Sequence, residues 1–331
     1  ISGQQVGLQA HQDIKIIGST VTATDALSLK AGGNITVAST VTESHAAGTV
    51  QSNHQVSLDR VAGLYVTNSD GAGLLRVDAA GDVTLQAAQL GNAAANGLTA
   101  VVAGGDLNLT TQSLSRSTDI TGDARNFTRS SDITHVGTTV SGAGSVVLAA
   151  GKDINLTAAQ IGAGEALALQ AGRDINSQAA VDSSSRDRSS VTKSNSLASS
   201  TYDETVRGTQ LGAGGDITLQ AGRDMTLAST SAASLEGGIA LAAGNDIKLL
   251  ATQEQHDVVV DKQTKDKGTL SSKTTTTHDE WHDSLAVVST LSAETVSIVA
   301  GNDLLSQGTQ IVGTGDVVLA AGNNLTLATA Q

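Results

Sequence analysis

A short phrase recurs ten times along the chain, at alternating short and long intervals. The phrase is A-G-x-[DN]-[ILVM]-x-[LVS], and an alternating L-x-L-x usually precedes it. With its acidic or amide residue as the anchor, successive anchors are 21, 48, 24, 47, 21, 50, 22, 57 and 21 residues apart. A fixed period in this range is the mark of a solenoid, in which each repeat buries its apolar face against its neighbours. The anchors are Asp13, Asn34, Asp82, Asp106, Asp153, Asp174, Asp224, Asp246, Asp303 and Asn324.

Each phrase predicts two short strands around a tight turn. ALALQ and DINLT both alternate apolar with small or polar residues, the period of a half-buried strand. The glycine supplies a positive φ or a close backbone approach, and the anchor side chain can bond the amides of its own turn. A third strand, as in AAQIGAG, completes 21 residues. The sequence therefore predicts an all-β fold, a parallel β-helix of three-strand coils; a β-sandwich is the alternative, but sandwiches have no such fixed period.

The composition fits a narrow interior filled layer by layer. The chain has 36 Gly, no Pro, no Cys and four aromatic residues, so Ala, Val, Leu and Ile must fill the core. We expect Leu148, Ile154, Leu169 and Ile175 to be buried. The lack of Cys excludes disulfides and thiolate metal sites, and no apolar run reaches the length of a membrane span. A formal net charge of -13 argues against a nucleic-acid partner, which would need clustered Lys and Arg.

The long intervals contain polar insertions on every second coil. They lie near residues 39–76, 111–141, 178–209 and 251–295, and stretches such as HDVVVDKQTK are typical of polar β-hairpins. An insertion on every second coil recurs about every 10 Å, which is also about the width of a two-stranded hairpin. The four hairpins are therefore expected to pair edge to edge into a second, antiparallel sheet. Separate mobile hairpins are the alternative.

No motif in the chain predicts a catalytic, cofactor-binding or metal site. HDEWH at 278–282 resembles a zinc motif, but that motif needs Glu directly after the first His, on a helix. On a strand, His278 and His282 would lie ~13 Å apart, too far to share a zinc ion. One Asp per coil also gives too few oxygens for calcium. We expect the anchors to cap turns, with Lys152, Arg173 and Arg223 reducing the repulsion between stacked carboxylates.

Enzymes that cleave polysaccharides also use parallel β-helices, so catalysis has to be weighed. Such a site needs clustered carboxylates, and usually aromatic platforms for sugar rings. Each insertion holds only one ring, so the chain is expected not to be an enzyme. Each ring either packs its hairpin onto the coil below or belongs to an exposed stripe that docks a partner. The four rings are Tyr65, Phe127, Tyr202 and Trp281.

The repeats resemble the haemagglutinin-repeat region of two-partner-secreted exoproteins of Gram-negative bacteria. That family includes filamentous haemagglutinin-like adhesins and the exoproteins of contact-dependent growth inhibition. The resemblance rests on AGGNITV, AGGDLNL, AGKDINL, AGRDINS, AGRDMTL, AGNDIKL and AGNNLTL, and on polar insertions such as KDKGTLSSKTTTTHDEWHD. It implies a right-handed β-helix filament, exported through an outer-membrane β-barrel transporter and displayed at the cell surface. It supplies no catalytic residue.

Two functions are compatible with this resemblance. The chain is either a filament segment that supports toxin delivery to a target cell, or an adhesive module whose insertions bind a receptor or glycan. The first phrase starts close to residue 1 and the last one ends close to residue 331, so we expect the chain to be a fragment of a longer protein. A solenoid without caps also exposes open strands at its ends, which favours end-to-end self-association.

Overall fold

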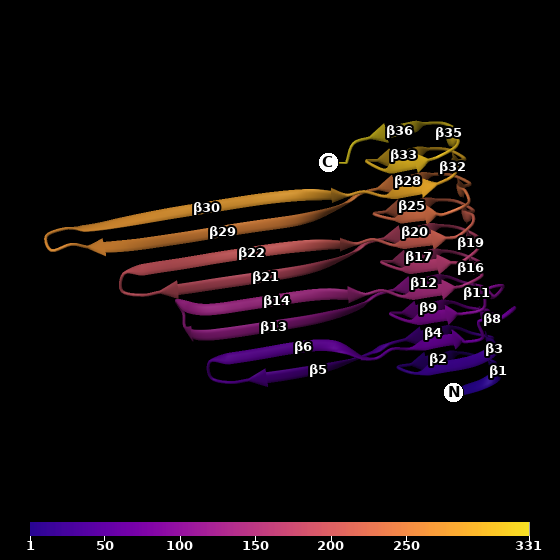
Figure 1. Cartoon of the computed structure of the whole chain (residues 1–331), viewed down its shortest axis with the longest axis horizontal. Coiled ribbons are helices and arrows are strands. Elements are labelled where there is room, and N and C mark those ends of the chain that lie inside the picture. The colour runs from indigo at the N-terminus through magenta and orange to yellow at the C-terminus, as the bar shows by residue number, and fades with distance from the viewer. Residues whose placement is uncertain (331) are drawn as a thin grey trace.

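The computed structural model of the chain is a parallel β-helix from which four hairpins project on one side (Figure 1). It describes residues 1–330, so Gln331, the last residue of the predicted array, lies outside it. Within these residues every element is a strand, and no helix capable of crossing a membrane is found. The strands form sheets of 18, 10 and 8 strands, and the first two sheets make the solenoid. The predicted all-β fold class is confirmed.

The first wall of the solenoid is the 10-stranded parallel sheet, built from the segment that follows each anchor residue. Its strands are β2 (Ile14–Ile17), β4 (Ile35–Ala38), β9 (Val83–Gln86), β12 (Leu107–Thr110), β17 (Ile154–Thr157), β20 (Ile175–Gln178), β25 (Met225–Ala228), β28 (Ile247–Leu250), β33 (Leu304–Gln307) and β36 (Leu325–Ala328).

The other two walls belong to the 18-stranded parallel sheet. Its strands are β1 (Ser2–Ala10), β3 (Thr20–Ala31), β7 (Gly63–Val66), β8 (Leu74–Ala79), β10 (Gln89–Asn92), β11 (Leu98–Ala103), β15 (Thr139–Gly142), β16 (Ser145–Ala150), β18 (Gln160–Ala163), β19 (Leu167–Ala171), β23 (Gln210–Ala213), β24 (Ile217–Ala221), β26 (Ser231–Ser234), β27 (Ile239–Ala243), β31 (Thr290–Ala293), β32 (Val296–Ala300), β34 (Gln310–Gly313) and β35 (Val317–Ala321).

The core consists of aliphatic side chains stacked in register from coil to coil. Leu148 pairs with Leu169, and Ile154 with Ile175, so like residues lie directly above one another. All four are at most 1% exposed, which confirms the predicted core. Because parallel strands keep this register along the axis, each coil covers the apolar face of its neighbour, and the interior needs no large rings.

The glycine of each phrase is required by close stacking of the turns. A Cβ atom on Gly172 would lie 2.3 Å from the carbonyl oxygen of Gly151, and one on Gly222 would lie 2.2 Å from that of Gly172. Neither glycine has a positive φ. Of the two reasons for this glycine offered by the sequence, the structure therefore supports close backbone approach.

The alternation of short and long intervals follows from what the chain does five residues after each anchor. In coils without an insertion, that residue has a positive φ and turns the chain directly into the next wall. These residues are Gly18, Ala87, Ala158, Ser229 and Gly308. In the coils anchored by Asn34, Asp106, Asp174 and Asp246, the chain instead leaves the solenoid one residue later as the first strand of a hairpin.

The four hairpins form the 8-stranded antiparallel sheet, called here the hairpin sheet. Neighbouring hairpins pair through β6 and β13, β14 and β21, and β22 and β29, so the expected edge-to-edge sheet is confirmed. Figure 1 shows the hairpins lengthening from the first to the last. The strands are β5 (Thr40–Ala47), β6 (Gln51–Arg60), β13 (Gln112–Asp123), β14 (Asn126–Val136), β21 (Ala180–Val191), β22 (Asn195–Arg207), β29 (Thr252–Lys267) and β30 (Ser272–Val287).

Candidate functional site: the hairpin sheet and the anchor ladder

The ten anchors form one continuous ladder along the solenoid. A side-chain oxygen of each of the first nine anchors accepts a hydrogen bond from the backbone N–H of the next anchor. For example, the N–H of Asn34 donates to Asp13 at 2.8 Å, and the N–H of Asp174 donates to Asp153 at 3.2 Å. The anchors were expected to bond the amides of their own turns, but the amide that each one bonds lies in the next coil. The physical reason is that stacked turns place the next amide within hydrogen-bond reach of the carboxylate.

From Asp174 onward, the residue before each anchor supplies a second donor to the preceding anchor. Arg173 binds Asp153 through Nε at 2.6 Å and also through its terminal nitrogen, and Arg223 binds Asp174 in the same bidentate way. The Arg173 guanidinium lowers the pKa of Asp153, and the carboxylate of Asp174 raises the pKa of Arg223. In the last coils Asn245, Asn302 and Asn323 donate instead.

These contacts predict that Asp174→Ala destabilises the solenoid by about 2 kcal/mol, since the variant leaves the amide of Asp224 without its acceptor and removes the bidentate partner of Arg223, which keeps only its contact with the Asp224 carboxylate. Asp174→Asn keeps an oxygen for the amide, as Asn34 does for Asp82, and should cost clearly less. Chemical denaturation of both variants tests this. Equal losses would show that the amide contact contributes nothing.

The hairpin sheet is a single layer with solvent on both faces. Away from the solenoid, its side chains are half-buried or exposed, so it has no apolar core of its own. Near the solenoid, carboxylates bridge neighbouring hairpins. Asp182 accepts from the N–H of His135 at 2.7 Å and from Nε of Arg207 at 2.7 Å, and Glu254 accepts from the N–H of Val206 at 2.6 Å. Backbone pairing and these bridges therefore hold the layer together.

The four rings do not gather into one stripe. Tyr65 lies in β7. This strand is part of a wall of the solenoid, because it pairs in register with β3 and β10. Phe127 and Tyr202 point to one face of the hairpin sheet. Phe127 pairs with Ser189 and Tyr202 pairs with Ser185, and these two serines lie on the same face of β21 because they are an even number of residues apart. Trp281, one residue out of phase with this set, points to the opposite face.

Three of the rings have polar partners. The Tyr65 hydroxyl donates to Gln89 at 2.8 Å, and burial raises the pKa of Tyr65. The Tyr202 hydroxyl donates to Glu204 at 2.6 Å, which raises the pKa of Tyr202. The Arg129 guanidinium lies 4.5 Å from the centre of the Phe127 ring. Trp281 is 55% exposed, so it is the ring most available to a partner.

HDEWH lies on β30 and forms a chain of histidines and carboxylates across the last hairpin. His278 bonds Asp261 at 2.7 Å and His282 bonds Asp257 at 2.7 Å, and both histidines also contact Glu280, at 3.4 and 2.7 Å. Sequence reasoning expected only surface polar residues here. The contacts to β29 arise because antiparallel pairing places Asp261 opposite His278 and Asp257 opposite His282.

We expect this cluster to make the last hairpin sensitive to pH. Asp261 first, and then Glu280, raises the pKa of His278 above its ordinary value of 6.5; Glu280 first, and then Asp257, does the same for His282. The two histidines, His282 first, lower the pKa of Glu280 below 4.5. The histidine contribution to stability is complete below pH 6.5 and is lost as pH rises through the raised pKa values. The glutamate contribution is complete above pH 4.5 and is lost as pH falls.

We therefore predict that amides of β29 and β30 exchange more slowly, after correction for intrinsic rates, at about pH 5.5 than at about pH 8. Hydrogen exchange with mass spectrometry provides the measurement. His278→Gln together with His282→Gln should reduce the difference, and the further change His256→Gln should remove it, because Asp203 also raises the pKa of His256 in β29. Amides of β17 and β20 in the solenoid serve as an internal control. A pH difference of unchanged size in the double variant would contradict this assignment.

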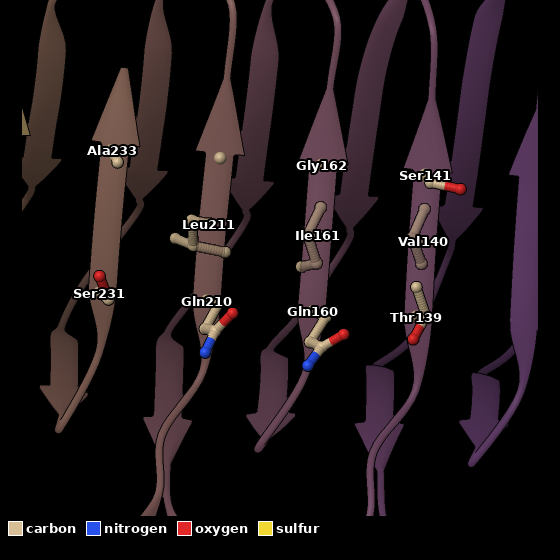
Figure 2. A pocket seen from close by; sticks show the side chains of 11 residues that line it. Thr139, Val140, Ser141, Gln160, Ile161, Gly162, Gln210, Leu211, Ser231 and Ala233 are labelled. Atoms are coloured by element: carbon tan, nitrogen blue, oxygen red, sulfur yellow. The ribbon is translucent and has the colours of Figure 1, made fainter. Parts of the chain in front are cut away.

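No arrangement of side chains in the described residues points to catalysis or to a cofactor. In residues 1–330, no three His, Asp or Glu side chains are placed to hold a metal ion together. The wall formed by β15, β18, β23 and β26 has a shallow depression of about 400 Å³. Figure 2 shows Gln160 and Gln210 side by side on neighbouring strands, each next to Ile161 or Leu211 along its strand. The lining of the depression is amide, hydroxyl and apolar, without a group suited to acid–base chemistry.

Comparison with known proteins identifies the family of the chain. The model of the hemagglutinin repeat family matches residues 1–62 and 189–331, more than half of the chain. The chain belongs to this family. It is the haemagglutinin-repeat region of a two-partner-secretion exoprotein, a class that Gram-negative bacteria secrete to the cell surface. No solved structure showed significant similarity.

Three curated relatives are much longer than this chain. A "tRNA nuclease CdiA" of Escherichia coli (strain STEC_O31) is 38% identical over 191 residues, which are 57% of this chain and 6% of the relative. A "16S rRNA endonuclease CdiA" of Enterobacter cloacae is 41% identical over 93 residues, 28% of this chain and 3% of the relative. A "tRNA nuclease CdiA" of Yersinia mollaretii is 39% identical over 99 residues, 29% of this chain and 3% of the relative. The chain therefore corresponds to a small repeat segment of such proteins.

Proposed function

We propose that this chain is a non-enzymatic, reinforced stalk segment of an exoprotein that delivers a toxin to a neighbouring cell on contact. The observation that carries the proposal is the continuous hairpin sheet, which runs beside the solenoid across all four hairpins. A second layer joined to the solenoid at every other coil resists bending, because the hairpin pairs must separate or shear before the filament can curve. The names of the relatives, nucleases of the CdiA type, support toxin delivery as the setting.

In this proposal, the toxin and the nuclease activity belong to other parts of such a protein, and the outer-membrane transporter is the export partner. The segment supplies length and stiffness, and no residue of it takes part in chemistry. The single-layer character of the sheet fits this role, since its strands are held by backbone bonds along their lengths rather than arranged around a pocket.

Removal of single hairpins tests the stalk function. Deleting residues 112–136 splits the hairpin sheet, because β13 and β14 lie between the first and third hairpins. Deleting residues 252–287 removes the last hairpin and leaves a continuous six-stranded sheet, so it is the matched control. In the full exoprotein, we expect the first deletion to increase filament curvature in electron micrographs and to reduce killing of target cells more than the second. Straight filaments and full killing in both would overturn the proposal.

One observation favours a second function, adhesion through the last hairpin. Trp281 is 55% exposed and Leu270, at the tip between β29 and β30, is fully exposed at 100%. Exposed aromatic and apolar side chains are favoured anchors of protein interfaces. An adhesive segment should lose binding to target cells in Trp281→Ala or Leu270→Ser, whereas a stalk should keep full killing and binding in both variants.

A further inference from the structure

The hairpin sheet has two free edges, and they differ in character. One edge is β5, which is short and has an irregular register near the solenoid, between Thr40 and Val41. The other is β30, whose pairing with β29 is regular over all 16 residues and which has no other partner among residues 1–330. Natural sheets protect long edges with prolines, bulges or inward-pointing charges. The distal half of β30 has no proline or bulge and a single basic residue, Lys273.

The backbone groups that β30 presents outward can be assigned from the hydrogen bonds around it. The N–H of Lys265 donates to Ser194 of the neighbouring hairpin, so the odd-numbered residues of β29 face β22 and the even-numbered ones face β30. Lys262 pairs with Thr277 and Val260 with Asp279. The odd-numbered residues of β30 therefore bond β29, and the N–H and C=O groups of its even-numbered residues point to the free edge.

The charges along this edge favour antiparallel over parallel pairing of two β30 strands. The six distal residues, Ser-Lys-Thr-Thr-Thr-Thr at 272–277, have no acid, whereas the next six, His-Asp-Glu-Trp-His-Asp at 278–283, have three. Two β30 strands in parallel would align Asp279, Glu280 and Asp283 with their own copies, which is unfavourable. Antiparallel pairing instead places each acid-containing segment opposite a threonine-rich one.

We propose that the free edge of β30 binds a second copy of this chain by antiparallel strand pairing about a two-fold axis near Thr277, which joins two hairpin sheets into one. In this register Thr276 pairs with His278 of the other copy through outward backbone groups, and Thr274 pairs with Glu280. Lys273 then lies beside Trp281 of the other copy on the same face, where its ammonium can rest on the exposed indole ring. Because a two-fold contact uses the same surface twice, the assembly closes at a dimer.

This contact differs from end-to-end stacking of solenoids and does not depend on the stalk role. It joins filaments side by side at the longest hairpin. Pairing of β30 with the free β5 edge of another copy would be head-to-tail, and it would give open chains of molecules rather than dimers. The mass of the assembly therefore separates the two arrangements.

The test is sedimentation of the purified 331-residue chain over a range of concentrations, with Thr276→Pro and Thr276→Val as a matched pair. The N–H of Thr276 points to the free edge, so proline should leave the fold intact while it removes an intermolecular donor and blocks close approach. We expect a concentration-dependent dimer for the wild type and Thr276→Val, and association about tenfold weaker or more for Thr276→Pro.

Circular dichroism and the denaturation midpoint of Thr276→Pro show whether the solenoid is unchanged. If proline disrupts the hairpin, Lys273→Glu provides an independent variant, because it leaves the backbone intact and places an acid beside the indole of the other copy; we expect it to weaken the dimer too. A monomer at every concentration would overturn the proposal. So would assemblies larger than a dimer, or a dimer that both Thr276→Pro and Lys273→Glu leave unchanged.

Discussion

Gly222→Ala is expected to destabilise the solenoid by about 3 kcal/mol, although it adds only one methyl group. The new Cβ would lie 2.2 Å from the carbonyl oxygen of Gly172 in the coil below, where no flexible side chain can move aside. The coils on both sides are fixed by parallel backbone pairing, with β24 held between β19 and β27. To relieve the clash, the turns must separate, which would stretch the anchor bond between Asp174 and the N–H of Asp224.

Gly212→Ala is the matched control, because a Cβ on Gly212 would meet nothing within 4 Å. It lies on the outer surface of β23, and its cost should stay within about 0.5 kcal/mol. Urea denaturation of both variants gives the comparison. If the midpoint of Gly222→Ala matched that of Gly212→Ala, close stacking of the turns could not be the reason for glycine in the phrase.

The sequence was sufficient to predict the solenoid because its information is periodic. A phrase repeated ten times reports the same turn and the same buried positions, so Leu148 and Ile175 could be placed in the core without any tertiary information. The hairpin sheet was predicted from a coincidence of lengths: two coils rise by about the width of one hairpin. Neither inference depended on the chemistry of single residues.

The side-chain contacts between coils could not be predicted from the repeat in this way. Asp174 bonds Asp224, 50 residues later, and Arg223 reaches back to the same carboxylate, because a whole hairpin separates two stacked turns. The signal was present in the phrase itself, where the residue before each anchor from Asp174 onward is Arg or Asn. Its meaning depends on which turn lies beneath, and only the stacking order supplies that. The ring positions failed to form a stripe for a related reason, since a shift of one residue moves a strand side chain to the other face.

The His278–Glu280–His282 cluster shows the same limit at a smaller scale. Alternation along β30 places the three side chains on one face, which the sequence does contain. The carboxylates that complete the cluster, Asp257 and Asp261, come from β29, and they reach the histidines only through the register of the hairpin. A register one residue different would have placed either Val260 and His256 or Lys262 and Val258 opposite the two histidines instead.

Leu169→Ala is expected to cost about 2–5 kcal/mol in unfolding free energy, with similar losses for Leu148, Ile154 and Ile175. Leu169 is 1% exposed and stacks between Leu148 and Leu219 in neighbouring coils. Truncation opens a cavity bounded by these two residues. The backbone cannot close it, because the strand spacing along the axis is fixed by hydrogen bonds.

Gln170→Ala supplies the control, since Gln170 is the next residue of β19 and is exposed on the outer surface. Its change should be small, within about 0.5 kcal/mol. A solenoid gains stability coil by coil from nearest-neighbour contacts, so the cavity at Leu169 weakens the interfaces with both adjacent coils. Hydrogen exchange should therefore show the loss concentrated in β16, β19 and β24, with the distant strands β3 and β35 protected as before. A uniform loss of exchange protection along the whole array would mean that the coils unfold together as one unit and not coil by coil.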